Sequence, residues 1–193
     1  MTTTLVLTRK PNAIFQSTAR KTDSGRFGTL VVLQGGKVTN ASISSGNGSG
    51  GSGAIVVPTG VLNVTTADGG EVRELKRFTT IERMGGYVQL KPQEYNGKKY
   101  KEGPYGLRYE SGNAVVSQLK GTGGKCFRVL GGLTAQERAI LIHAAPNVAW
   151  LIGCIGPRRL GDRSTGDTET TFSAMAELFG VSPKPSQLFV LDW

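Results

Sequence analysis

Glycine recurs along this chain at short intervals, and this recurrence limits the folds that the sequence can adopt. The 193 residues include 28 glycines, roughly twice the share of ~7% that is usual in proteins. Glycine disfavours long helices and suits tight turns, while the apolar stretches of the chain are rich in valine, isoleucine and threonine, which favour strands. The pattern predicts a mainly β fold of short strands, arranged as a mixed or antiparallel β-sandwich or barrel-like domain.

The length fits a single domain that spans residues 1–193 around one core. Residues 42–53 are almost entirely Ser, Gly and Asn, a composition that buries no apolar surface, so we expect a flexible loop there. Residues 71–109 are polar and basic, and we interpret them as an inserted loop or hairpin pair with one clear strand at 87–90. A closing edge strand is expected at 187–191.

One segment has the periodicity of a helix. Its apolar residues fall three or four positions apart, on one face: Phe172, Met175, Ala176 and Phe179. Asp167 is a suitable N-cap and Gly180 a suitable C-terminal stop, so the sequence predicts one C-terminal helix near 167–179 that packs on the core. Further strands are expected at residues 2–8, 28–33, 54–57, 114–119 and 127–130.

The net charge of +9, from 23 Lys and Arg against 14 Asp and Glu, suggests a polyanionic partner such as nucleic acid, an anionic cell wall or a membrane surface. The basic residues are scattered along the chain, however, so a generally solvated basic surface explains the charge equally well. The sequence lacks the aromatic and basic motifs of RNA or single-strand binders, and we expect no nucleic-acid partner.

No stretch of eighteen apolar residues is present, so we expect no membrane span. The N-terminus lacks the charged and apolar regions of a secretory signal peptide. We therefore expect a protein that is cytoplasmic when made. A role outside the cytoplasm would require lysis, a secretion apparatus or delivery as part of a virion.

Two glycine-rich stretches resemble nucleotide-binding loops but lack their context. Residues 48–53 match G-x-G-x-x-G without a preceding strand or a following helix, and residues 121–125 do not have the P-loop spacing. We expect no cofactor. The two cysteines are too few for a disulfide framework, and a zinc site built from Cys126, Cys154 and His143 would lack any C-x-x-C pair, so we expect no metal.

The stretch 140–157 holds the only histidine, His143, and one of the two cysteines, Cys154. Each lies in a short apolar run, which is typical of two buried strands joined by a turn, here at Pro146 and Asn147. An imidazole within hydrogen-bond reach of a thiol is the minimum for cysteine catalysis, because the thiolate is the nucleophile. Taken singly, a cysteine is usually a small buried hydrophobe, so only the pair suggests a site.

Two pieces of this sequence resemble the YkuD-like L,D-transpeptidase superfamily. PTGVLNV, at 58–64, is similar to its P-x-G-x-aromatic-x-V strand, with Leu62 in the aromatic position. IHAAPNVAWLIGCI resembles its histidine and G-C-[IV] signature, most closely that of a small phage and prophage branch of unknown function. In that branch the histidine and cysteine are eleven positions apart, as His143 and Cys154 are here.

The resemblance implies an acyl transferase or L,D-carboxypeptidase that acts on peptidoglycan stem peptides through a thioacyl intermediate. Cys154 would be the nucleophile and His143 the general base and acid. Gly153 would provide backbone geometry for the oxyanion. Arg158 or Arg159 would bind substrate in place of an arginine that the family carries directly after the G-C-[IV] signature.

The chain departs from the family at two positions, where Leu151 replaces a serine and Gly156 replaces the arginine. These departures leave a second interpretation open. The chain would then be a structural component of a phage virion, tail or baseplate that keeps the fold without activity, with other virion proteins or further copies of itself as partners.

Overall fold

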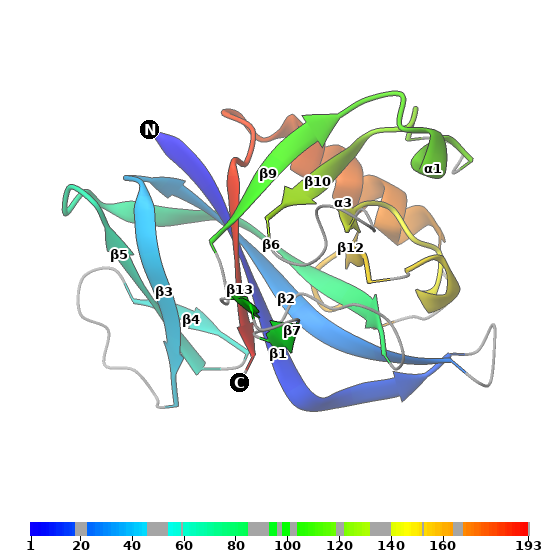
Figure 1. Ribbon diagram of the computed structural model, residues 1–193, viewed down its shortest axis with the longest axis horizontal. Coiled ribbons are helices and arrows are strands. Elements are labelled where there is room, and N and C mark those ends of the chain that lie inside the picture. The colour runs from blue at the N-terminus through cyan, green and yellow to red at the C-terminus, as the bar shows by residue number, and fades with distance from the viewer. Residues whose placement is uncertain are drawn as a thin grey trace.

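The structure is a computed structural model, and it describes residues 1–17, 23–45, 54–58, 60–84, 93–95, 98–100, 104–118, 122–131, 140–151, 153–163 and 168–192. Eight of its strands close into a barrel in the order β1-β13-β9-β10-β11-β12-β6-β2 (Figure 1). These are β1 (Thr2–Gln16), β2 (Ser24–Gly35), β6 (Val72–Arg83), β9 (Tyr105–Glu110), β10 (Cys126–Leu130), β11 (Leu141–Ile142), β12 (Ile155–Arg158) and β13 (Gln187–Asp192).

The barrel is mixed, because β1 pairs in parallel with β13 and β11 with β12, whereas its other pairs are antiparallel. Alternate apolar residues of each strand point inward and form the main core. Its barrel members include Leu5, Leu7, Leu30, Val32, Phe78, Phe127, Val129, Ile142, Ile155, Leu188 and Val190. The predicted mainly β, barrel-like fold is confirmed.

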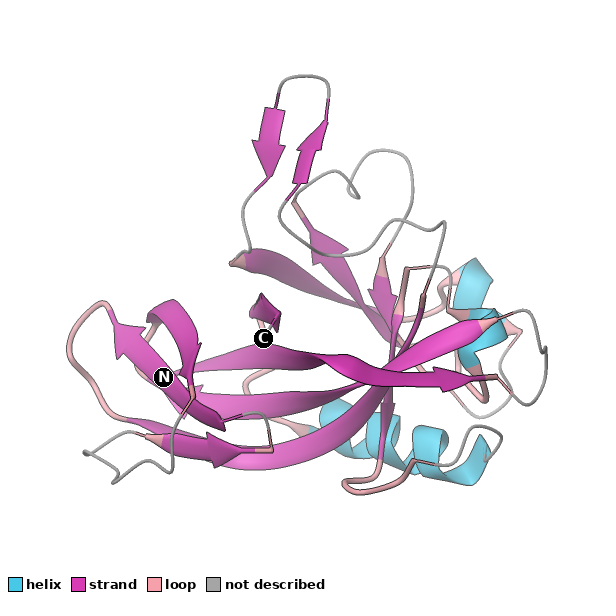
Figure 2. Ribbon diagram, turned by 90° about the horizontal axis from the view of Figure 1, so that it is seen from below, coloured by secondary structure: helices cyan, strands magenta, loops and turns pink. Residues whose placement is uncertain are grey.

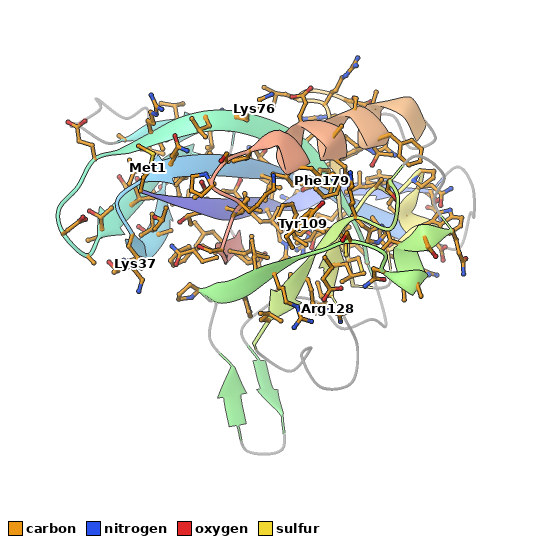
Figure 3. The ribbon with its side chains drawn as sticks, turned by 90° about the horizontal axis from the view of Figure 1, so that it is seen from above. Met1, Lys37, Lys76, Tyr109, Arg128 and Phe179 are labelled. Atoms are coloured by element: carbon orange, nitrogen blue, oxygen red, sulfur yellow. The ribbon has the colours of Figure 1, made fainter. Side chains whose placement is uncertain are left out.

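The predicted C-terminal helix is present as α3 (Thr168–Gly180), and the N-cap expected at Asp167 lies outside the described residues. Ala174, Met175 and Leu178 enter the main core, while Ala176, expected on the apolar face, is exposed. The helix is also held by aromatic contacts, because the ring of Phe179 lies 5.8 Å from that of Tyr109 (Figure 3).

A second sheet covers part of the outside of the barrel (Figure 1). It has the order β3-β5-β4, formed by β3 (Val38–Ser44), β5 (Gly60–Thr66) and β4 (Ile55–Val57). Its apolar side chains, including those of Val38, Val57 and Leu62, pack against Val31 and Phe189 on the outer face of the barrel. Residues 42–44 thus belong to a strand rather than to the predicted flexible loop, and 46–53 lie outside the described residues.

Three smaller elements complete the described chain. The hairpin of β7 (Gln93–Tyr95) and β8 (Lys98–Tyr100) projects from the barrel (Figure 2). Helix α1 (Ala114–Ser117) occupies residues predicted as a strand, because the side chain of Asn113 accepts a hydrogen bond from Val115 N and caps a helical turn. The short 3₁₀ helix η1 spans Val148–Trp150. No helix in the described part of the chain is long and apolar enough to cross a membrane.

Two predictions about strands were wrong. The segment 71–109 is not simply an insertion, because residues 72–83 form the barrel strand β6, and the strand expected at 87–90 lies outside the described residues. Polar Thr80 and Glu82 occupy buried positions of β6, which concealed the strand from an apolar pattern. The predicted edge strand at 187–191 exists as β13, but it lies between β1 and β9 in the closed barrel.

Four charged residues lie together at one end of the barrel, where they take the place of apolar core residues. Arg9 binds Glu82 through two hydrogen bonds, Nε to Oε2 at 2.7 Å and Nη2 to Oε1 at 2.5 Å. Asp192 lies 3.3 Å from Arg9 Nη1, and Arg26 Nη2 lies 3.8 Å from Glu82 Oε2. Burial lowers the pKa of Arg9, but the two carboxylates outweigh burial and raise it overall. We call these four residues the charged plug.

Candidate functional site

The two predicted site residues flank two adjacent strands, since His143 directly follows β11 and Cys154 directly precedes β12. β11 and β12 run in parallel with Ile142 opposite Ile155, and His143 N donates to Ile155 O at 3.1 Å. Ile142 and Ile155 point into the barrel core, so side-chain alternation directs His143 and Cys154 to the outer face. His143 follows Ile142, and Cys154 precedes Ile155, which lies opposite Ile142. The two are therefore diagonal neighbours on that face.

The second strand begins later than the sequence predicted. The apolar run that holds Cys154 was expected to form it, but β12 starts only after Cys154 and includes both Gly156 and Pro157. Gly153 instead has a φ of 84°, a left-handed conformation that suits glycine. β12 pairs with β11 only at Ile155. Pro157, which has no N–H, therefore does not have to donate a backbone hydrogen bond to β11.

Cys154 lies in a closed apolar environment. Only 7% of the residue is exposed, and it packs in an apolar cluster outside the main core, whose other buried members are Ile81, Val116, Cys126, Leu141, Ala145, Val148 and Leu151. Burial raises the pKa of the thiol to about 11, although a hydrogen bond from Leu141 N at 3.4 Å partly offsets this. At neutral pH the sulfur is therefore a thiol rather than a nucleophilic thiolate.

His143 is equally enclosed, with 4% of the residue exposed. Its Nδ1 lies 2.7 Å from Ala144 O, so Nδ1 carries the proton as a donor and Nε2 remains an acceptor. Burial lowers the pKa of the imidazole more than this hydrogen bond raises it, which keeps the ring neutral near pH 7. Within the described residues, no hydrogen bond joins the imidazole to the Cys154 thiol.

Leu151 explains why the site is closed. It is fully buried, and a Cβ built at Gly156 would lie 3.2 Å from Leu151 Cδ1, Ala145 Cβ and Ile81 Cγ1. Gly156 has no side chain, and the side chain of Leu151 fills the space beside it. Positions 151 and 156 are therefore in contact, since a side chain at 156 would require Leu151 or another neighbour to shift by a few tenths of an ångström.

The loop that follows His143 is anchored by Arg158, whose side chain has no exposed surface. Arg158 Nη2 donates to Pro146 O at 2.7 Å and to Ala145 O at 3.4 Å, and Nη1 lies 3.4 Å from Asp162 Oδ2. Binding of a substrate by Arg158 would require this loop to move. Arg159 is exposed, and its Nε donates to Ser173 Oγ at 2.9 Å.

Thr171 is a buried polar residue that the sequence did not single out. Its hydroxyl accepts from Ala145 N at 3.0 Å and donates to Pro157 O at 2.9 Å, so one side chain of α3 joins the loop after His143 to strand β12. Its only sequence signal was a polar residue adjoining the apolar face of the helix, which is too weak to predict this contact.

The second cysteine, Cys126, belongs to the same apolar cluster. Burial, followed by the charge of Glu110, raises the pKa of its thiol to about 11. Neither cysteine is in a disulfide bond. Within the described residues, no group of three or more His, Cys, Asp or Glu side chains is arranged to hold a metal ion.

Comparisons with protein-family models, curated proteins and solved structures find no match to this chain. Its function is therefore inferred from its own residues and their geometry.

Proposed function

We propose that this chain is a cysteine acyl transferase, or an L,D-carboxypeptidase-like hydrolase, that acts on peptidoglycan stem peptides and is encoded by a phage or prophage. The observation that carries the proposal is that His143 directly follows β11 and Cys154 directly precedes its parallel neighbour β12, which makes the two residues diagonal neighbours. The resemblance of both motifs to the YkuD-like superfamily supplies the substrate class.

The chemistry would start from the neutral pair. Nε2 of His143 would accept the proton of the Cys154 thiol, and the thiolate would attack a stem-peptide carbonyl. The N–H of Cys154, oriented by the left-handed Gly153, would stabilise the oxyanion. The imidazolium would then return its proton to the leaving amine, leaving a thioacyl enzyme. An amine would resolve it by cross-linking, or water by trimming.

The closed environment requires an opening step in this mechanism. Leu151 and η1 cover the thiol. Removing one oxyanion donor typically costs about 2.7–4 kcal/mol of transition-state stabilisation, so a small displacement of the Cys154 N–H would change the rate strongly. We propose that substrate binding displaces Leu151 and brings the imidazole of His143 to the thiol. The basic surface of the protein suits approach to an anionic wall.

The test is incubation of the protein with tetrapeptide-bearing muropeptides and mass spectrometry of the products. The expected result is cross-linked or trimmed products from the wild type and none from Cys154→Ala. Cys126→Ala is the matched control, because it removes the other thiol of the same cluster. Identical product spectra from wild type and Cys154→Ala would exclude the enzyme.

A second function is favoured by one observation, the buried and protonated state of the Cys154 thiol. We propose as the alternative a structural component of a phage virion, tail or baseplate, in which the fold persists and Leu151 has sealed the former site. Iodoacetamide distinguishes the two. A thiol activated by muropeptide is alkylated faster when substrate is added, whereas a sealed thiol reacts equally slowly with and without it.

A further inference from the structure

A pocket of about 320 Å³ lies away from the His143 and Cys154 pair, on the outer face of β1, β2 and β6. Its wall is completed by Pro58, which precedes β5, and by Leu160, Gly161 and Arg163 after β12. This volume lies at the lower end of the range of small-molecule sites. None of the described residues that line it is a carboxylate.

The floor of this pocket is a row of three threonines. Thr8 lies opposite Thr29 in the β1–β2 pair, and Thr29 lies opposite Thr79 in the β2–β6 pair. Thr79 Oγ1 accepts from Gly161 N at 2.9 Å, which leaves its own proton to donate. The hydroxyl of Thr29 makes no hydrogen bond to any described residue, although it lines the pocket. Thr29 and Thr79 therefore present hydroxyl donors to a ligand.

Three cationic side chains surround this floor: Lys10, Arg77 and Arg163. Arg77 is held rigidly, because its Nε and Nη2 bind Glu74 and its Nη2 also donates to Val56 O. The guanidinium of Arg163 lies 5.9 Å from the centre of the Phe27 ring. Glu74 neutralises Arg77, so the positive charge of the described part of the pocket comes from Lys10 and Arg163.

We propose that this pocket binds a small phosphate ester. Lys10 and Arg163, from two separate segments, together with a row of hydroxyls match a tetrahedral oxyanion of charge near −2, which offers acceptors in several directions. A carboxylate has two coplanar oxygens and one charge, which a single arginine satisfies. The apolar wall formed by Ala13, Phe27, Pro58 and Leu160 would contact the organic part of the ester.

The experiment is calorimetric titration of the full chain with phenyl phosphate at about pH 8 and constant ionic strength, with benzoate as the carboxylate probe. We expect saturable binding of phenyl phosphate at one site and much weaker binding of benzoate. Lys10→Gln and Arg163→Gln should each lower the affinity for phenyl phosphate by roughly tenfold, as expected for the loss of a charge-assisted contact. Lys37→Gln, which removes an equal charge from an exposed residue outside the pocket, leaves the affinity unchanged.

Thr29→Val is the sharpest variant, because it preserves the shape of the side chain and removes a hydroxyl that bonds to no described residue. We expect weaker phenyl phosphate binding with an unchanged urea midpoint. Equal losses in Lys37→Gln and Arg163→Gln would overturn the proposal by showing nonspecific attraction. So would equal binding of benzoate, an unchanged affinity in Thr29→Val, or binding of an oligonucleotide but not of phenyl phosphate. Cys154→Ala should bind phenyl phosphate normally, so this test is independent of the proposed acyl transfer.

Discussion

The charged plug and the cluster around Cys154 both bury ionisable groups, yet they hold them in opposite states. In the plug, Arg9 and Glu82 are 1% and 3% exposed and form two hydrogen bonds with each other, and the nearby carboxylates raise the pKa of Arg9 despite its burial. Around Cys154, apolar side chains surround the thiol and the imidazole, and burial moves both pKa values toward the neutral forms. Burial preserves a charge only where a partner of opposite sign is buried with it.

The two regions therefore differ in what they can do chemically. Arg9 and Glu82 are bound to each other, whereas a neutral thiol and a neutral imidazole can exchange a proton once they meet. The plug is a structural feature of the barrel, whereas the proposed acyl transfer would start in the Cys154 cluster.

The largest expected effect comes from breaking the plug. Glu82→Gln leaves the buried guanidinium of Arg9 without its main counter-charge, and we expect the free energy of unfolding to fall by about 3–5 kcal/mol. Urea denaturation measures the change. The control is Glu177→Gln, which breaks the exposed pair with Lys76, 45% exposed on each side, at a cost of about 0–1 kcal/mol. Equal losses in the two variants would contradict the role given to burial.

The next effect concerns pH and the two thiols. Because burial raises the pKa of Cys154 and Cys126 from about 9 to about 11, the folded state retains protons that the unfolded state releases. This contribution is fully present below about pH 9 and is lost as the pH rises toward about 11, by about 2–3 kcal/mol per thiol. Urea denaturation at several pH values should show a shallower decline in a Cys126→Ala, Cys154→Ala double variant. An unchanged decline would disprove the assignment.

Adjacent arginines provide a third, smaller test. Arg158→Leu removes the donor to Ala145 O and Pro146 O, and we expect a loss of about 1–3 kcal/mol in the free energy of unfolding, because a buried carbonyl loses its partner. Arg159→Leu removes an exposed side chain and should change stability by less than about 0.5 kcal/mol. Thermal unfolding of both variants compares them directly, and a costlier Arg159→Leu would reverse the assignment.

The smallest effect is the titration of His143. Since burial lowers its pKa, the folded state binds a proton less readily than the unfolded state, so this contribution to stability is present above about pH 6.5 and is lost as the pH falls. His143 is the only histidine, so its ring resonance can be followed by NMR without assignment. A midpoint at or above about 6.5 in the folded protein would refute the apolar environment described for it.

Much of the fold could be predicted from local patterns. Alternating apolar residues predicted β1 and β2, the periodicity around Met175 predicted α3, and frequent glycines favoured a β architecture. β6 escaped prediction because Thr80 and Glu82 fill its buried positions, and the burial of Glu82 is satisfied only by partners distant in sequence. α1 was not predicted, because the Asn113 cap outweighs the strand preference of Val115 and Val116 in this helix of four residues.

The sequence by itself determined the candidate pair, through the spacing of His143 and Cys154, and it identified Leu151 and Gly156 as departures from the pattern that the chain resembles. Only the tertiary structure decided that these departures fit together, since Leu151 fills the space over Gly156. The protonation states also depend on the tertiary structure, because a pKa reflects the charges and apolar groups that surround a side chain in space. Those neighbours are brought together from β6, α1, β10 and η1, and no local pattern in the chain records their meeting.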